Sequence, residues 1–287
     1  MTVHVGWFTT ARGPGSRGMY EAARAAIEDG SLDAKISFVF SNRDRGEDPV
    51  TDEFFARIEA DGIPLIAKSS VRYRKAVGGE RSRPGEPLPA WRTAYDEEVA
   101  TAISEYRCDI GVLAGYMLIF SAPFVERFPL LNLHPALPTG PIGTWREVNR
   151  TLIRESATES GVMINLAIPE VDEGPVVAYC RYPITGPVFD TARADLGAPA
   201  DLDDATLEAS SLFGLIREAG MRCEAPFLVE VLQAFGSGRV KIEDGSVTYA
   251  SGRAALPVDL TDEVNARLRA ATSIEAPAGQ VAGEALG

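Results

Sequence analysis

The sequence of 287 residues predicts an α/β fold: a doubly wound, mostly parallel sheet with a C-terminal helix and a β-hairpin extension. Two observations support this prediction. Short apolar runs alternate with amphipathic stretches through the first half, which is typical of β-α-β units joined by right-handed crossovers. The run at 109–115 (DIGVLAG) is almost continuously apolar, as expected for a strand at the centre of a parallel sheet.

The first half is expected to supply most of the sheet. Its apolar runs predict buried strands at 3–8, 35–41, 63–67, 109–115 and 130–134. Helices are expected between them, namely one that ends near residue 27 after a Gly-rich turn at 12–18, and others at 51–60, 91–106 and 122–127. The basic, Gly/Pro-rich stretch 69–89 is expected to form a long loop, and loops of that length are usually functional or mobile.

The second half predicts a different arrangement. Its expected elements are extended segments at 162–168 and 176–184 around a turn at 172–175, an acidic surface-loop insert at 186–204, a helix over 207–235 broken near Pro226, and a hairpin at 238–249 that turns at Asp244-Gly245. Residues 1–257 are interpreted as one catalytic domain that includes the insert. Residues 258–287 are interpreted as a C-terminal helix and a flexible tail, which frays from about residue 273.

Composition narrows the function. The net charge of -13 argues against nucleic-acid and acidic-membrane partners and leaves a small-molecule substrate as the expected partner. The three cysteines are widely spaced, which suits reduced thiols in the cytosol. The sequence contains neither a CxxC nor an HxxxH pair, so no bound metal is expected. The sequence shows neither a signal segment nor an uninterrupted apolar run of about 18 residues. A cytoplasmic protein is therefore expected, and a homodimer is compatible with the sequence.

The chemistry is expected at the end of the strand at 130–134. The chain holds only two histidines, and His134 closes this strand before a Pro/Gly-rich loop. Histidine is the usual side chain for proton transfer near neutral pH, and open α/β sheets place ligands at such strand ends. Asn132 faces the same way as His134, because side chains two apart in a strand share a face. A carboxylate such as Asp172 would orient the imidazole, and the amide would stabilise an oxyanion. Packing against the backbone is the alternative role for His134.

The chain resembles the folate-dependent formyltransferases. The resemblance rests on Tyr95-Asp96, Leu113-Ala114-Gly115-Tyr116-Met117, Asn132-Leu133-His134-Pro135, the segment from Gly161 to Asp172-Glu173-Gly174-Pro175, Ser41-Asn42, and the stretch from Pro226 to Gly245. It covers most of residues 3–257. The pairing of Asn-x-His-Pro with Asp-x-Gly-Pro is fairly specific.

The resemblance implies a reaction and a set of site residues. A formyl group would pass from 10-formyltetrahydrofolate to the amine of a small metabolite, phosphorylated or not. Glycinamide ribonucleotide or a related amine is the implied acceptor. Such a reaction belongs to one-carbon metabolism and purine biosynthesis. The implied catalytic residues are Asn132, His134 and Asp172. The implied folate-binding residues are Tyr116, Met117, Leu118, Ile119, Glu170 and Val171, of which Leu118 and Ile119 are equally compatible with a core role. The implied substrate- or phosphate-binding residues are Gly13, Gly15, Ser16, Arg17, Arg92 and Glu218.

Two of these assignments have ordinary structural alternatives. Gly/Pro turns between a strand and a helix are common whether or not they bind an anion, although a helix N-terminus attracts one. Arg92 would equally suit a solvated position near the start of its helix.

The sequence departs from the family pattern near the acceptor. Arg17 replaces an asparagine, Asn165 replaces a histidine, and Met221 stands where an acidic residue holds the amine, with Glu218 and Arg222 beside it. The loop after Pro138 also differs. These changes leave the expected formyl chemistry in place and put the identity of the acceptor in doubt.

Two rival functions remain open. Formyltetrahydrofolate deformylases are similar around the same three residues but use water as the nucleophile. They typically carry an N-terminal regulatory domain, whereas the first strand here begins at residue 3. The second rival is a non-catalytic folate- or nucleotide-binding protein, which retention of Asn132, His134 and Asp172 argues against.

Overall fold

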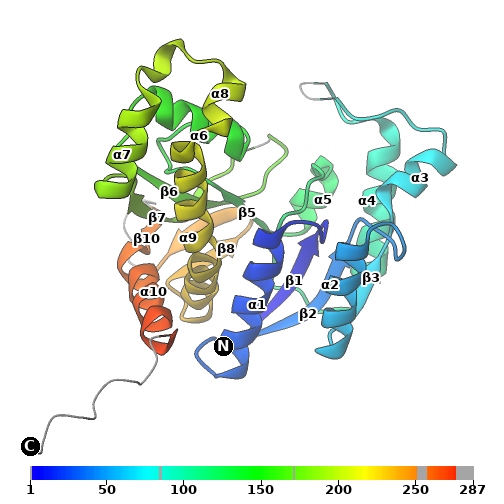
Figure 1. Cartoon of the computed structure of the whole chain (residues 1–287). Helices are drawn as coiled ribbons and strands as arrows, with labels where there is room; N and C mark the ends of the chain where they lie inside the picture. The colour runs from blue at the N-terminus through cyan, green and yellow to red at the C-terminus, as the bar shows by residue number, and fades with distance from the viewer. Residues whose placement is uncertain (1, 84–85, 171, 251–256, 276–287) are drawn as a thin grey trace, which may run out of the picture.

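The computed structural model describes residues 2–83, 86–170, 172–250 and 257–275. In them an eight-stranded sheet has the order β10-β7-β6-β5-β4-β1-β2-β3 (Figure 1). Its strands are β1 Val3–Thr9, β2 Ala34–Ser41, β3 Leu65–Ala67, β4 Ile110–Leu113, β5 Leu130–His134, β6 Glu159–Leu166, β7 Val176–Pro183 and β10 Val258–Asp259. A separate hairpin joins β8 Val240–Glu243 to β9 Ser246–Tyr249.

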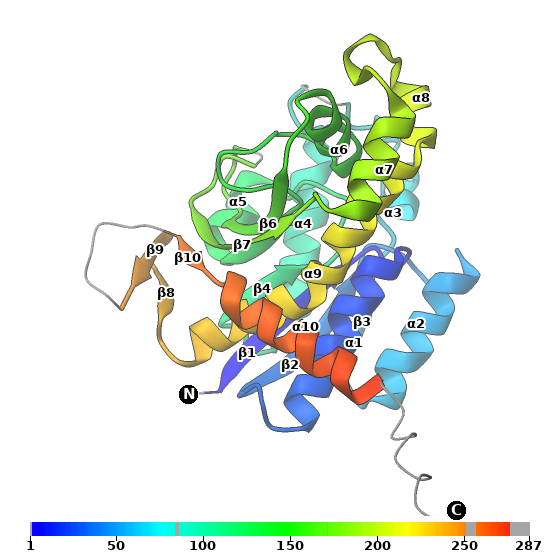
Figure 2. The same cartoon turned by 60° about the vertical axis from the view of Figure 1, so that its left-hand side comes forward.

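Helices cover both faces of the sheet (Figures 1 and 2). They are α1 Pro14–Glu28, α2 Pro49–Ala60, α3 Ser70–Ala76, α4 Ala90–Ile103, α5 Ala122–Arg127, α6 Trp145–Arg154, α7 Pro187–Leu196, α8 Asp204–Ala209, α9 Ser211–Gly236 and α10 Thr261–Glu275, with a 3₁₀ turn at Pro199–Asp201. None of the helices in the described residues is long and apolar enough to cross a membrane.

The pairing of the strands confirms the predicted fold class. β1 runs parallel to β2 and β4, and β4 runs parallel to β5. Within the described part of this eight-stranded sheet, β6 alone is antiparallel to both of its neighbours, β5 and β7. Because β1, β4 and β5 are parallel, their carboxyl ends meet at one edge, and the loops that follow them lie together there.

Two apolar clusters fill the two sides of the sheet. Trp7 and Phe8 are adjacent on β1 and fully buried, yet they belong to different clusters, because successive side chains of a strand point to opposite faces. Trp7 contacts Tyr20 of α1 edge-on at 5.7 Å, and Phe8 contacts Phe124 of α5 at 6.1 Å. The sheet is therefore doubly wound, as predicted.

Three predicted loops and breaks were wrong. Residues 69–89 contain α3, whose start is capped by the Ser69 hydroxyl accepting from the Arg72 N–H at 3.1 Å. Residues 186–204 fold mainly into α7 and the 3₁₀ turn. The helix expected over 207–235 is interrupted at Ser210, whose hydroxyl caps α9, and it continues through Pro226. In each case local capping or packing overrides composition.

Helix α6 lies in a segment for which the sequence analysis predicted no element, whereas the predicted hairpin and C-terminal helix are both present. α6 starts at Trp145 with a capping box between Thr144 and Glu147, a T-x-x-E pattern that is visible in the sequence. The β8–β9 hairpin confirms its predicted turn, with positive φ at Asp244 and Gly245. The C-terminal helix is present as α10, while the tail predicted past it lies outside the described residues from 276 onward.

Candidate active site

The site lies at the carboxyl edge of β1, β4 and β5. The loop after β4 is tied to the loop after β1, because the Met117 N–H donates to the Thr10 hydroxyl at 3.1 Å. Gly115 has a φ of +66°, and a Cβ there would lie 2.9 Å from the Cβ of Ser16 in the first turn of α1. Glycine at this position lets the start of α1 pack against the loop that follows β4.

Asn132 and Asp172 meet in space. The Nδ2 of Asn132, on β5, donates to Oδ1 of Asp172 at 2.9 Å. Asp172 has a φ of +60°, a left-handed conformation that aspartate tolerates better than most residues. The turn is fixed by Gly174, where a Cβ would lie only 1.7 Å from the carbonyl oxygen of Leu166. The fold therefore presses this turn against the end of β6 and holds the carboxylate beside the amide.

His134 sits at the same strand end but contacts a different partner. Its side chain is 4% exposed, and Nε2 lies 3.2 Å from the carbonyl oxygen of Pro141. A carbonyl only accepts hydrogen bonds, so Nε2 carries the hydrogen in this arrangement and Nδ1 is the basic nitrogen of the neutral ring. The expected hydrogen bond between His134 and Asp172 is not among those of the described residues. The carboxylate here orients Asn132 instead.

Asn165, which replaces a histidine of the family pattern, is a candidate site residue to which the sequence analysis gave no role. It pairs with Asn132 across the β5–β6 ladder, so the two side chains lie next to each other on one face. Asn165 is 1% exposed, and its Oδ1 is buried without a hydrogen-bond partner in the described residues. An unpaired buried carbonyl is costly, which makes this atom a candidate acceptor for a ligand or water. The cross-strand register that reveals it is a tertiary feature.

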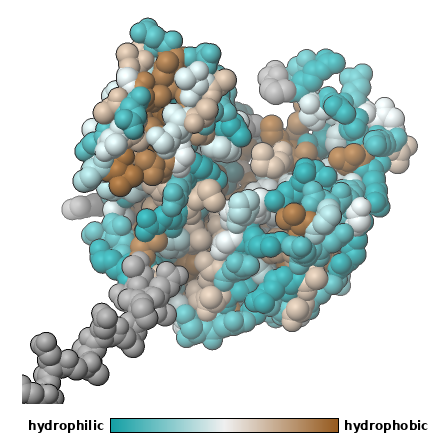
Figure 3. All heavy atoms as spheres, in the orientation of Figure 1, coloured by the Kyte–Doolittle hydropathy of each residue, from teal (hydrophilic) through white to brown (hydrophobic). Residues whose placement is uncertain are grey.

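The loop predicted to bind folate divides into buried and exposed side chains. Tyr116 is buried and stacks on Phe120 at 4.7 Å, whereas Met117 and Ile119 are 79% and 46% exposed. Leu118 is half-buried against the core. Two apolar side chains of the loop after β4 are thus presented to solvent. In Figure 3 the surface is hollowed between the α6–α8 side and the α3–α4 side of the molecule, and apolar residues are visible in the hollow.

The other predicted folate-binding residues lie on the loop before Asp172. Glu170 is exposed, and Val171 lies outside the described residues.

Arg92 and Asp96 of α4 anchor the loop that follows β4. Arg92 is 1% exposed, and its Nη2 donates to the Ile119 carbonyl at 2.5 Å. Asp96 accepts from the Ser121 N–H at 2.6 Å, and the two side chains lie 3.6 Å apart. Burial raises the pKa of Asp96, opposed by the Ser121 hydrogen bond and by Arg92. Arg92 is therefore neither a solvated residue nor exposed to a phosphate; it anchors the loop after β4.

The predicted phosphate turn is mostly helix. α1 begins at Pro14 with Gly13 as its N-cap, so Gly15, Ser16 and Arg17 form its first turn rather than a turn that runs to residue 18. The Ser16 hydroxyl donates to the Gly13 carbonyl at 2.9 Å. The side chain of Arg17 points to α2, 3.6 Å from Glu53.

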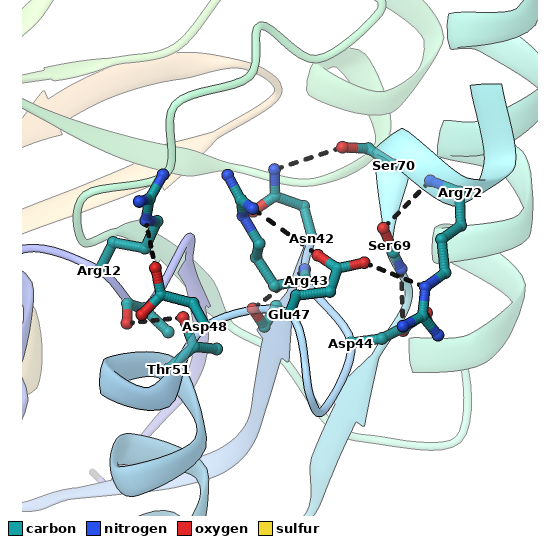
Figure 4. Close-up of polar contacts among 12 residues, drawn as sticks. Arg12, Asn42, Arg43, Asp44, Glu47, Asp48, Thr51, Ser69, Ser70 and Arg72 are labelled. Carbon is teal, nitrogen blue, oxygen red and sulfur yellow. Dashed lines mark hydrogen bonds and ion pairs between the residues drawn. The ribbon is translucent and has the colours of Figure 1, made fainter. Parts of the chain in front are cut away.

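Charged side chains near this turn are largely neutralised by one another. Arg12 pairs with Asp48 at 3.0 Å. Figure 4 shows this pair and the neighbouring network at the ends of β2 and β3, in which Arg72 lies 3.2 Å from Glu47. The network links the loops at this edge of the sheet. Its arginines are already paired with carboxylates, so they are not available to bind an anion.

Glu218 lies on the wall of a cavity of about 570 Å³. The cavity lies between the start of α6 and the first half of α9, and its lining residues are Trp145, Phe213, Gly214, Arg217, Glu218, Met221 and Arg222. Its volume falls in the range of small-molecule sites, roughly 300–1,000 Å³. No group of three or more potential metal-binding side chains occurs among residues 2–83, 86–170, 172–250 and 257–275.

An amide, an imidazole and a carboxylate gathered at the carboxyl edge of a doubly wound sheet define an enzyme equipped for acyl-group chemistry. Comparison with known proteins specifies the class. A family model described as "Formyl transferase" matches residues 14–193, more than half of the chain. The chain belongs to the formyl transferase family and is an enzyme of that family.

Individual relatives agree with this assignment. Phosphoribosylglycinamide formyltransferase of Dictyostelium discoideum is 31% identical over 170 residues, which cover 55% of this chain and 75% of the relative. The solved phosphoribosylglycinamide formyltransferase of Coxiella burnetii has a TM-score of 0.62 at 20% identity and covers 90% of this chain and 99% of that one. A formyltetrahydrofolate deformylase of Pseudomonas syringae has a TM-score of 0.57 at 14% identity, covering 87% of this chain and 66% of that one. The two solved structures establish the likeness of fold.

Proposed function

We propose that the protein transfers a formyl group from 10-formyltetrahydrofolate to the primary amine of a small metabolite. The observation that carries this proposal is the Asn132–Asp172 hydrogen bond beside His134, at the strand end where ligands bind in such sheets. The hollow in Figure 3 and the exposed Met117 and Ile119 suit a flat, partly apolar pterin. The relatives named for purine biosynthesis and for phosphoribosylglycinamide support an amine acceptor.

The donor supplies the formyl carbon and leaves as tetrahydrofolate once its N10 has taken a proton. Asn132 uses one Nδ2 hydrogen to bind Asp172, so its second Nδ2 hydrogen is available to the formyl oxygen as negative charge develops there. Asp172 fixes the orientation of that amide. His134 receives a proton at Nδ1 from the attacking amine and returns one to the leaving nitrogen. The new C–N bond forms at the amine as the bond from the formyl carbon to N10 breaks.

The experiment is a turnover assay with 10-formyltetrahydrofolate, following tetrahydrofolate with and without added amine. Glycinamide ribonucleotide is the reference acceptor, and a panel of primary amines extends the search. We expect tetrahydrofolate formation to depend on an amine and to match formylated product one to one. Equal turnover without any amine would assign the protein to the hydrolases. Absence of both turnover and donor binding would overturn the proposal and favour a non-catalytic role.

A further inference from the structure

A buried carbonyl oxygen near the end of β6 has no hydrogen-bond donor among the described residues. It is Oδ1 of Asn165, whose side chain is closed to solvent. Such an atom is unfavourable in a folded protein, because it has lost its hydrogen bonds to water without gaining others. An oxygen of this kind next to a candidate active site points to a donor that a bound substrate supplies.

The cross-strand register places this side chain within the candidate site. Asn165 stands directly opposite Asn132 in the antiparallel β5–β6 pair, where the two Cβ atoms are about 4.5–5.5 Å apart. His134 lies two residues further along β5, opposite Met163, and is therefore a diagonal neighbour of Asn165 on the same face, roughly 7–8 Å away. Asn132, His134 and Asn165 thus form a triangle on one face of the sheet.

The backbone is irregular beside Asn165. Ile164 pairs with Ala178 of β7, whereas Asn165 pairs with Val176, so Val177 is an extra residue in β7. Bulges of this kind are common next to active sites, where they redirect a side chain. The irregularity coincides with the residue that carries the unpaired oxygen, as expected where a strand orients a site residue.

The hydrogen-bonding needs of an attacking primary amine match these three side chains. The neutral amine has two N–H groups, and its lone pair must face the formyl carbon. The Nδ2 of Asn132 is a donor, so it serves Asp172 and the formyl oxygen rather than the amine. His134 takes one proton of the amine at Nδ1. The other N–H needs a second acceptor, and Oδ1 of Asn165 can only accept.

We propose that Oδ1 of Asn165 accepts a hydrogen bond from the second N–H of the attacking amine and thereby makes the site selective for primary amines. This inference rests on the proposed formyl transfer and assigns it a specificity-determining residue. Attack places positive charge on the nitrogen, so the hydrogen bond is stronger in the transition state than in the bound amine. Asn165 neither gains nor loses a proton. Its oxygen becomes accessible when the bound substrate displaces the side chains that cover it.

Two acceptors that differ by one N–H test this selectivity. They are glycinamide ribonucleotide, or the best primary amine of the panel, and the N-methyl derivative of the same amine. With 10-formyltetrahydrofolate as donor, we expect the wild type to have a kcat/KM about tenfold or more higher for the primary amine, as for a lost hydrogen bond to a charged group.

The Asn165→Val variant removes the acceptor and keeps a side chain that suits a strand. It should lower kcat/KM for the primary amine about tenfold or more and leave kcat/KM for the N-methyl amine nearly unchanged. The preference for the primary amine therefore shrinks, while the dissociation constant of the donor stays the same. Asn165→Ala removes the same oxygen without adding volume and repeats the test if valine is not accommodated.

Two further variants separate recognition from packing. Asn165→Asp keeps an acceptor oxygen in either protonation state of the carboxyl, so it should retain the preference for the primary amine. Asn149→Val is the matched control, because Asn149 of α6 is also buried and its Nδ2 has no partner in the part of the chain that the structure describes. It should change neither the preference nor the dissociation constant of the donor.

Stability gives a readout that does not depend on turnover. Removing a buried acceptor that has no donor within the protein relieves an unfavourable burial. Asn165→Val should therefore unfold at the same denaturant concentration as the wild type or at a higher one. An oxygen that holds the fold together would have the opposite effect.

The outcomes separate this inference from the proposed function. An unchanged preference in Asn165→Val, or a clear loss of stability with the preference intact, would overturn the inference and leave formyl transfer in place. Loss of the preference in Asn165→Asp as well would also overturn it, since an acceptor oxygen is still present there. Failure of the wild type to bind the donor, or turnover that needs no amine, would instead remove the proposed function.

Discussion

At the scale of single residues, the site depends on one contact across the chain. Asn132 and Asp172 are 40 residues apart and are joined by a hydrogen bond of 2.9 Å. Because Asp172 holds one N–H of the amide, the other has a defined direction, which is the property that oxyanion stabilisation requires. His134 is held separately by the Pro141 carbonyl, so its orientation depends on the loop before α6.

Removing either side chain should slow the reaction and leave the fold intact. We expect His134→Ala and Asn132→Ala each to lower kcat/KM at least ~100-fold, the usual range for a lost proton-transfer group or oxyanion donor. The measurement is steady-state turnover with saturating donor. His4→Ala is the control, because the second histidine lies on β1 with Nδ1 3.2 Å from the Ser37 hydroxyl. Unchanged turnover in His134→Ala would refute its role.

At the scale of elements, short turns determine where the candidate site residues lie. The turn between β6 and β7 carries Asp172, and its backbone passes so close to Leu166 that residue 174 has no room for a side chain. The loop after β4 is similarly fixed by Arg92 and Asp96 beneath it. These contacts explain why glycine and buried charge occur next to the strands that carry the candidate site.

Gly174→Ala tests the role of the turn. The added Cβ would lie 1.7 Å from the Leu166 oxygen, so the turn must shift and carry Asp172 away from Asn132. We expect a loss of about 1–3 kcal/mol in the free energy of unfolding, as for other overpacked sites, and a fall in kcat/KM of ~100-fold. Denaturant titration and turnover measure the two effects.

The matched control for this test is Gly18→Ala in α1, where a Cβ meets no atom within 4 Å. It should keep full activity and gain up to about 1 kcal/mol from helix propensity. Wild-type activity in Gly174→Ala would show that Asp172 need not be held in this turn.

At the scale of the whole molecule, the change of stability with pH depends on the carboxylates whose pKa the fold shifts. The net charge is -13, and most described carboxylates with a shifted pKa are surface groups whose pKa is lowered by hydrogen bonds, among them Glu147 and Asp203. Those groups lose their stabilising contribution as the pH falls. The pKa of Asp96 is shifted in the opposite direction, because burial raises it. Between its ordinary pKa of about 3.9 and the raised value, the folded state binds more protons than the unfolded state.

This sign gives a testable pH dependence. The contribution of Asp96 to the free energy of unfolding should be largest at low pH and should fall as the pH rises through its folded-state pKa. We therefore expect the wild type to lose stability relative to Asp96→Asn as the pH increases from about 4, with a constant difference above the titration. Denaturant unfolding of both proteins across this range measures it. A difference that changes in the opposite direction would show that Arg92 outweighs burial.

The sequence alone determined the fold class, most strands and the identity of the catalytic candidates. Apolar periodicity reports burial directly, and a histidine at a strand end identifies a functional edge before any contact is known. The pattern failed at α3 and α7, where capping and packing override composition, and at α6, where a visible capping box was passed over.

The tertiary structure alone decided which partners these residues have. It joined Asp172 to Asn132 rather than to His134, paired Asn165 with Asn132 across the ladder, and buried Arg92. It also set Glu224 against the start of α1. Such contacts join segments far apart in the chain, and their register and close approach follow from packing rather than from local sequence.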